Sequence, residues 1–216
     1  GIPVRRINAS AQTSRWSALA VLCAGQLMVI LDGTVVNVAL PSIQRDLGFS
    51  PSDLAWVVNA YVVPFGGLLL LSGRLGDLIG RKRVFIAGLS IFTAASLLCG
   101  VSQDPATLLA SRFVQGIGGA VTSAVTLGMV VTLFPQPKER AKAIGVYSFV
   151  QSAGGSMGLL AGGALTQTIS WHWIFFVNVP IGIMAALSAG RVLASEHAVG
   201  LGKGTDVVGA LLVTSA

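Results

Sequence analysis

The fold is decided by one long stretch of the sequence, 143-AIGVYSFVQSAGGSMGLLAGGALTQTISWHWIFFVNVPIGIMAALSAG-190. It runs for 48 residues without a single Asp, Glu, Lys or Arg. A helix needs about 20 apolar residues to cross a bilayer, so this stretch is long enough for two spans. We place the break at Ser170-Trp171-His172-Trp173, because indole rings suit the membrane interface.

The rest of the chain follows the same pattern. Hydrophobic residues make up 53% of it and charged residues only 10%, whereas soluble domains carry roughly 25% charged residues. So much apolar surface cannot be hidden inside 216 residues and must face lipid. The charge-free intervals predict an all-α, polytopic membrane helix bundle with spans at 16–40, 54–73, 84–102, 106–133, 143–167 and 173–194, and a seventh that begins near Val207.

The predicted organisation has three parts. Residues 1–15 form an N-terminal tail, residues 16–194 form a six-span half, and residues 195–216 form a loop with the start of the seventh span. The chain begins with Gly1 rather than Met, and Ala216 lies inside an apolar segment. We therefore expect a fragment of a longer protein, with a further half beyond it.

Basic residues predict the orientation. They cluster in the tail, in the second connection and in the fourth, whereas the first connection has only Arg45. The three clusters are Arg5, Arg6 and Arg15; Arg74, Arg81, Lys82 and Arg83; and Lys138, Arg140 and Lys142. By the positive-inside rule the N-terminus is cytoplasmic, in a plasma or bacterial inner membrane. The net charge of +6 reflects this topology and does not indicate nucleic-acid binding.

Several kinds of site are not expected. Cys23 and Cys99 both lie in apolar runs, and His172 and His197 are too few for a metal centre. The segment 115–120 resembles a dinucleotide fingerprint, but no strand precedes it. There is no Walker-type loop and no credible catalytic arrangement. We expect no cofactor, no metal and no enzymatic activity.

Asp32 lies well inside the first span, where an ionised carboxylate costs about 2.5–3.5 kcal/mol by insertion scales. That cost is tolerated if the side chain faces a watery cavity or exchanges protons. The alternative is a polar, helix-breaking patch formed with Gly33 and Asn37 near the outer leaflet. Because an acid inside a membrane is by default a functional site, we favour the first interpretation.

Arg112 begins a polar face on the fourth span. Gln115, Gly116, Gly119 and Ser123 follow it at offsets of 3, 4, 7 and 11 residues, so all five share one side of a helix. This face should look into the protein. Alternatively, Arg112 extends its side chain to the outer surface, since Asp104 lies only eight residues away.

The fifth span carries a glycine stripe at Gly154, Gly158 and Gly162. Such spacing lets another helix approach closely. The contact could be static packing, or a sliding contact between moving helices, and the spacing alone does not separate the two.

The segment from Gly73 to Arg83 resembles the signature loop of the major facilitator superfamily, G-x-L-a-D-r-x-G-r-k-r. It matches at Gly73, Asp77, Gly80, Arg81, Lys82 and Arg83 and departs only at Leu78. The segments 31–41 and 112–120 are similar to motifs of the drug:proton antiporters. Residues 171–182, with Asp206 and Gly209, resemble the fourteen-span EmrB/QacA branch. In the fifth-span motif, Leu159 replaces a proline, so symport stays open beside antiport.

The resemblance implies a transporter half built from two inverted three-helix repeats. It implies proton-coupled export of hydrophobic, often cationic, compounds. Asp32 and Arg112 would couple protons, and the Gly73–Arg83 loop would gate by contacts with the other half. Asn37, Gln115, Gly116, Gly119 and the glycine stripe would line the cavity or pack helices. The expected partners are a small-molecule substrate, protons, lipid and the missing half. A metabolite transporter and a non-transporting receptor remain alternatives.

Overall fold

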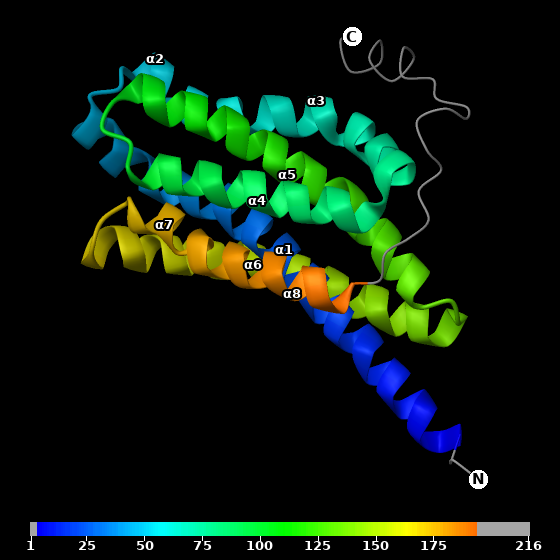
Figure 1. The fold of residues 1–216 in the computed structure, drawn as a ribbon. Helices are drawn as coiled ribbons and strands as arrows, with labels where there is room; N and C mark the ends of the chain where they lie inside the picture. The colour runs from blue at the N-terminus through cyan, green and yellow to red at the C-terminus, as the bar shows by residue number, and fades with distance from the viewer. Residues whose placement is uncertain (1–3, 194–216) are drawn as a thin grey trace.

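The computed structural model describes the backbone of residues 4–193 and the side chains of residues 14–193. Within this range every regular element is an α-helix (Figure 1). The helices are α1 (Val4–Leu47), α2 (Pro51–Leu54), α3 (Trp56–Ile79), α4 (Arg81–Gly100), α5 (Pro105–Leu133), α6 (Pro137–Thr168), α7 (Trp173–Phe176) and α8 (Asn178–Val192). The predicted seventh span, Asp206 and Gly209 lie outside the described residues.

The predicted spans fall on these helices, and most boundaries agree closely. Five helical segments are long and apolar enough to cross a membrane: Ser14–Leu47, Pro51–Ile79, Arg81–Gly100, Pro105–Leu133 and Trp173–Val192. The predicted span 143–167 lies within α6, which has 32 residues. This helix is not among the five, and its many glycine, serine, glutamine and threonine residues dilute its apolar character.

Helix α1 is longer than the predicted first span. It begins at Val4 and continues past Pro41 to Leu47. The backbone of residues 4–15, predicted as a tail, is therefore part of the same helix. The predicted signature loop is almost entirely helical as well. A single residue, Gly80, separates α3 from α4. Its φ is 97°, a value that glycine adopts readily and that is strained for residues with a side chain.

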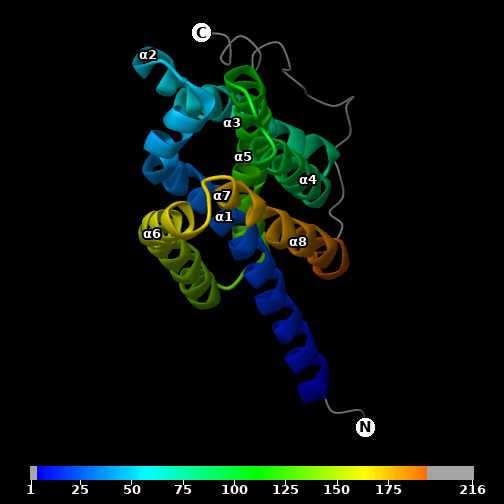
Figure 2. The same ribbon diagram turned by 90° about the vertical axis from the view of Figure 1, so that its left-hand side faces the viewer.

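The helices pack into one bundle with α1 and α5 near its centre (Figure 2). Helix α5 packs against α3 and α4, and α1 packs against α6 and α8, while contacts between α1 and α5 and between α4 and α8 join the two groups. The larger hydrophobic core includes Leu22, Met28, Phe85 and Phe92, all fully buried. This arrangement places the middle of α1 against the middle of α5.

The glycine stripe of α6 faces α1. A Cβ at Gly154 would meet Leu27, one at Gly158 would meet Thr34, and one at Gly162 would meet Val35. Small residues at these positions therefore allow the two backbones to approach closely. The predicted close helix contact is present. Whether it is static or slides during a cycle stays a prediction.

The predicted break at residues 170–173 is present between α6 and α7. Of its two indoles, Trp171 faces the interior of the protein. It is 1% exposed, and its indole Nε1 donates to Asp46 Oδ2 at 2.8 Å. The ring is buried because α7 turns back over the end of α1. Trp173, 46% exposed, keeps the exposure expected of an interfacial indole.

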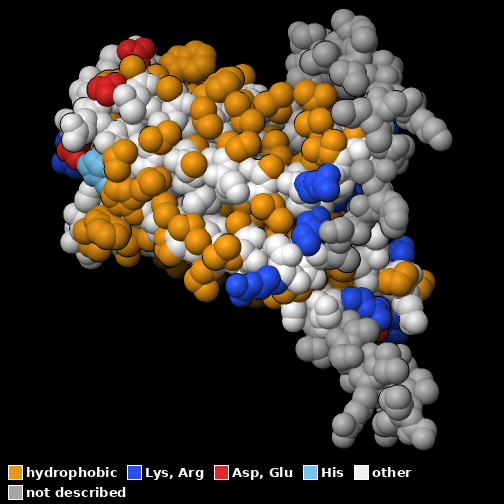
Figure 3. Space-filling model, in the orientation of Figure 1, with side chains coloured by type: hydrophobic (Ala, Val, Ile, Leu, Met, Phe, Trp, Pro, Cys, Tyr) orange, Lys and Arg blue, Asp and Glu red, His pale blue; other side chains and the backbone are white. Residues whose placement is uncertain are grey.

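The surface separates charge along the bundle (Figure 3). Lys and Arg side chains gather at the end where α3 meets α4 and α5 meets α6, which we call the basic end. Asp53 in α2 and Asp104 directly before α5 lie at the opposite end. Apolar side chains cover the face between the two ends. This distribution is typical of a bundle that spans a bilayer.

Candidate functional site

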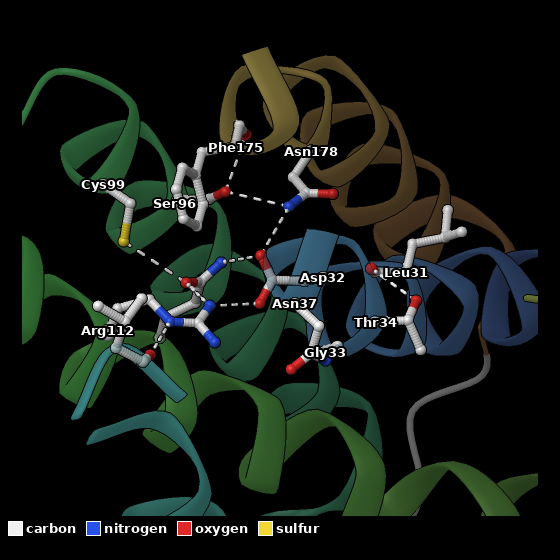
Figure 4. Close-up of polar contacts among 12 residues, drawn as sticks. Leu31, Asp32, Gly33, Thr34, Asn37, Ser96, Cys99, Arg112, Phe175 and Asn178 are labelled. Carbon is white, nitrogen blue, oxygen red and sulfur yellow. Dashed lines mark hydrogen bonds and ion pairs between the residues drawn. The ribbon is translucent and has the colours of Figure 1, made fainter. Parts of the chain in front are cut away.

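Asp32 and Arg112 meet in the centre of the bundle (Figure 4). Arg112 Nη1 donates to Asp32 Oδ2 at 2.6 Å, and the two residues are 0% (Asp32) and 1% (Arg112) exposed. Asp32 comes from α1 and Arg112 from α5, so the contact between these helices brings together residues 80 positions apart. Arg112 therefore points inward, and the alternative in which it extends to the outer surface is wrong.

Two further donors hold the Asp32 carboxylate. Gln115 Nε2 donates to Oδ1 at 2.9 Å, and Asn178 Nδ2 donates to the same oxygen at 3.3 Å. Gln115 also accepts from Arg112 Nη1 at 2.8 Å through its Oε1. Gln115 and Arg112 thus share one face of α5, as predicted, and they also bond each other.

Asn178 and its neighbour Ser96 were missed by the sequence reasoning. Asn178 Nδ2 donates to Ser96 Oγ at 3.1 Å, and Ser96 Oγ donates to the backbone carbonyl of Phe175 at 2.8 Å. Asn178 starts α8 directly after the helix break at Val177. Asn178 could have been found from the sequence, because a polar amide inside a predicted span is unusual. Ser96 gave no such signal, because an isolated serine in an apolar helix commonly bonds its own backbone.

Aromatic rings complete the surroundings of Arg112. The guanidinium carbon lies 4.5 Å from the centre of the Tyr61 ring and 5.8 Å from that of Phe175. Its Nε donates to the backbone carbonyl of Val57 at 3.0 Å. Cation–π contact and a charge-assisted hydrogen bond both offset the cost of burying the guanidinium. Arg112 is thus bound to α1, α3 and α7 at once.

The chemistry of this cluster follows from the direction of its hydrogen bonds. All three contacts to Asp32 are donated to the carboxylate, so the ionised form is fully satisfied. Burial excludes water from both oxygens. The carboxylate thus has contacts only with groups of the protein. The site is an ion pair closed off from solvent.

Other predicted site residues lie apart from this cluster. Asn37 is exposed, and its amide donates to the backbone carbonyl of Gly33 at 3.1 Å. Gly116 and Gly119 pack against α3, where a Cβ would meet the Tyr61 carbonyl and the Tyr61 hydroxyl respectively. The buried polar atoms Tyr61 Oη and Gln26 Oε1 have no partner among the described residues. Sequence reasoning singled out neither.

The signature segment forms a separate cluster at the basic end. Asp77 Oδ1 accepts from Arg81 Nη2 at 3.3 Å, across the break at Gly80. Arg81 Nη1 also donates to Thr132 Oγ1 at 2.9 Å and to the Gly128 carbonyl at 3.3 Å. Lys82 Nζ donates to the Gly190 carbonyl at 3.0 Å. The basic side chains therefore tie the start of α4 to the ends of α5 and α8 within this half.

These features define a multi-pass α-helical membrane protein with a buried ion pair at its centre. Residues 22–208 match the sequence model of the family described as Major Facilitator Superfamily. The chain belongs to the major facilitator superfamily, and the family expected from the motifs is confirmed.

Named relatives agree with this membership. The chain is 48% identical to the puromycin resistance protein pur8 of Streptomyces alboniger, over 92% of the chain and 39% of that protein. It is 42% identical to the cephamycin export protein CmcT of Amycolatopsis lactamdurans, over 98% of the chain and 45% of that protein. The chain thus spans less than half the length of these relatives.

A solved structure shares the fold. It is a bacterial homolog of the human lysosomal transporter Spinster in an inward-facing, unoccupied conformation. The TM-score is 0.70 at 22% sequence identity, and the match covers 90% of this chain and 46% of the other. The bundle described above is therefore one half of a major facilitator fold.

Proposed function

We propose that this chain is the N-terminal half of a proton-coupled exporter of small hydrophobic or cationic compounds, working by alternating access in a cell membrane. The observation that carries the proposal is the fully buried Asp32–Arg112 pair, held at 2.6 Å between the helices α1 and α5. Relatives whose names describe puromycin resistance and cephamycin export support the substrate class.

The proposed coupling role of Asp32 rests on an exchange of its partner, which is Arg112 in one conformation and a proton in the other. With Arg112 in contact, the carboxylate is ionised and satisfied. If α1 and α5 separate, the charge loses its counter-ion in an apolar environment, where the neutral acid is favoured. Alternating access would thus bind a proton in one conformation and release it in the other. Arg112 is the partner that decides between the two states.

We assign the gating role to Asp77 and Arg81 at the basic end, which we place on the cytoplasmic side. The positive-inside rule supports this orientation, since Lys and Arg concentrate at that end (Figure 3). Arg81 already bridges α4 and α5 within this half. Contacts from the other half to the same segment would close the inner side of the cavity.

The test is transport by the full-length protein in liposomes under an imposed pH gradient, with puromycin and ethidium as trial substrates. Asp32→Asn removes the titratable group at nearly equal volume and should abolish uphill export. The matched control is Asp53→Asn, the same chemical change at an exposed position, which should transport normally. Uphill export by Asp32→Asn at the wild-type rate would show that the proton does not pass through this residue.

Two outcomes of this experiment in the wild type would favour the alternative functions. Binding of a drug without its transport, although the pH gradient is imposed, would favour a receptor. Transport of neither drug, with proton movement on addition of a single metabolite, would favour a specific metabolite transporter.

A further inference from the structure

An apolar groove opens on the outside of the bundle between α1 and α6. Its cavity of about 480 Å³ is lined by Trp16, Ala20, Ala24 and Leu27 of α1 and by Val146 and Val150 of α6, among others. A second hollow of about 300 Å³ lies between α1 and α8 and shares Ala20 and Ala24 with the first. Helices α6 and α8 flank α1 on this side (Figure 2). The small side chains of α1 thus form a low ridge between two hollows.

The groove has the length of one membrane leaflet. From Trp16 to Leu27 there are eleven helical steps, about 16 Å of helix axis at 1.5 Å per residue. The hydrocarbon core of a bilayer is about 30 Å thick, so one leaflet contributes about 15 Å. Trp16 marks the end of the groove at the basic end, because the adjacent Arg15 pairs with Glu139 at the start of α6. Leu27 then lies near the middle of the membrane.

Positive charge stands at the mouth of the groove. Lys142 lies one helical turn before Val146, and its Nζ is 5.2 Å from the centre of the Trp16 ring. Lys142 is exposed, and no ion pair involves it in the described part of the chain. Arg15 Nη1 lies 3.4 Å from Glu139 Oε2, a long contact between two partly exposed side chains. Lys142, Arg15 and Glu139 together leave one net positive charge at the mouth of the groove, with Lys142 as its unpaired cation within the described residues.

We propose that this surface is a binding site for one anionic phospholipid of the leaflet at the basic end. Its two acyl chains occupy the hollows on either side of Ala20 and Ala24, and its phosphate lies at Lys142 and Arg15. Charge complementarity selects an anionic headgroup, since basic pockets between membrane helices on the cytoplasmic side attract such lipids. The site lies away from Asp32 and Arg112 and does not depend on the transport proposal.

The experiment is native mass spectrometry of the full-length protein, purified after exchange into equal amounts of phosphatidylglycerol and phosphatidylcholine. The wild type should retain one phosphatidylglycerol in preference. Lys142→Gln should weaken retention about five-fold, because one basic residue near the surface contributes about 1 kcal/mol to binding of anionic lipid. Lys142→Arg should restore it. The matched control is Lys138→Gln, an exposed basic position one turn earlier on α6, which should retain the lipid.

A second variant tests the apolar part of the site. Ala24→Leu fills the space shared by both hollows and should reduce retention with the charges intact. Met157→Leu, at an exposed position of α6, should have no effect. If Lys142→Gln and Lys138→Gln lost phosphatidylglycerol equally, the lipid would be attracted to the basic end as a whole. That result would overturn the proposal. The proposal would also be overturned if the wild type retained both lipids equally. That result is expected if another part of the protein covers the groove.

Discussion

The Arg112 guanidinium and the Asp32 carboxylate lie 2.6 Å apart in a region closed to solvent, and each is the other's counter-ion. Neither charge could be buried alone, because an isolated ion in an apolar environment is strongly disfavoured. The packing of α1 against α5 therefore depends on both members of the pair. Loss of either residue alone should lower the stability of the bundle.

The first prediction concerns the stability of the pair. Arg112→Met leaves the Asp32 charge without its partner and should destabilise the protein by about 3–5 kcal/mol. The double variant Asp32→Asn/Arg112→Met removes both charges and should regain much of this loss. Thermal unfolding of the full-length protein, followed with a thiol-reactive dye, measures both, because Cys23 and Cys99 are buried until unfolding. A double variant as unstable as the sum of its singles would show that the two charges do not interact.

The second prediction separates two glycines of α6. A Cβ at Gly158 would meet Thr34 of α1, whereas one at Gly155 meets nothing within 4 Å. Gly158→Ala should therefore destabilise by about 1–3 kcal/mol through overpacking. Gly155→Ala should be neutral or stabilise by about 0.5–1 kcal/mol, because alanine loses less chain freedom in a helix. Equal melting temperatures for the two variants would contradict the close approach of α1 and α6 at Gly158.

The third prediction concerns orientation. Ser50 and Gln136 are exposed near opposite ends of the bundle. A cysteine at position 50 should react with an impermeant thiol reagent outside intact cells, and one at position 136 should react only after permeabilisation. The buried native cysteines of this half give little background. Labelling of position 136 alone in intact cells would reverse the proposed topology.

The fourth prediction concerns Arg81. Arg81→Ala removes contacts to Asp77, Thr132 and Gly128 and should slow transport while insertion remains normal. The exposed ion pair alone contributes only about 0–1 kcal/mol, so the expected effect comes from the bridge between helices and from docking of the other half. Transport rates and membrane expression are compared with Arg74→Ala, an exposed arginine at the same end. If Arg81→Ala transported at the wild-type rate, the Gly73–Arg83 segment would serve only to set the orientation in the membrane.

The fifth prediction concerns pH at the opposite end. Partial burial lowers the pKa of His172 from its ordinary value, although Asp46 raises it, and the ring stacks on Trp171 at 3.8 Å. The folded protein thus favours neutral His172. Its contribution to stability is complete above the unfolded pKa of about 6.5 and is lost as pH falls below that value.

The melting temperature of the wild type should therefore fall between pH 7.5 and pH 5.0 by more than that of His172→Phe. Phenylalanine can stack on Trp171 without titrating, so it serves as the matched control. The same pH dependence in both proteins would assign the effect to other groups.

Sequence alone was enough to define the class of fold. Uncharged intervals long enough for a bilayer placed the helices, because a rise of about 1.5 Å per residue and a hydrocarbon core of about 30 Å together fix the length of a spanning helix. The motif around Asp77 and Arg81 identified the family. Periodicity also put Arg112 and Gln115 on one inward face, since residues three apart share a side of a helix.

Helix packing, by contrast, sets which partners these residues have. Asn178 and Ser96 join the Asp32 cluster from α8 and α4, and no local rule relates positions 146 residues apart. The burial of Trp171 depends on α7 folding over the end of α1, which the residue type alone does not reveal. Spacing along one helix shows which residues share a face, whereas the packing of helices determines what that face meets.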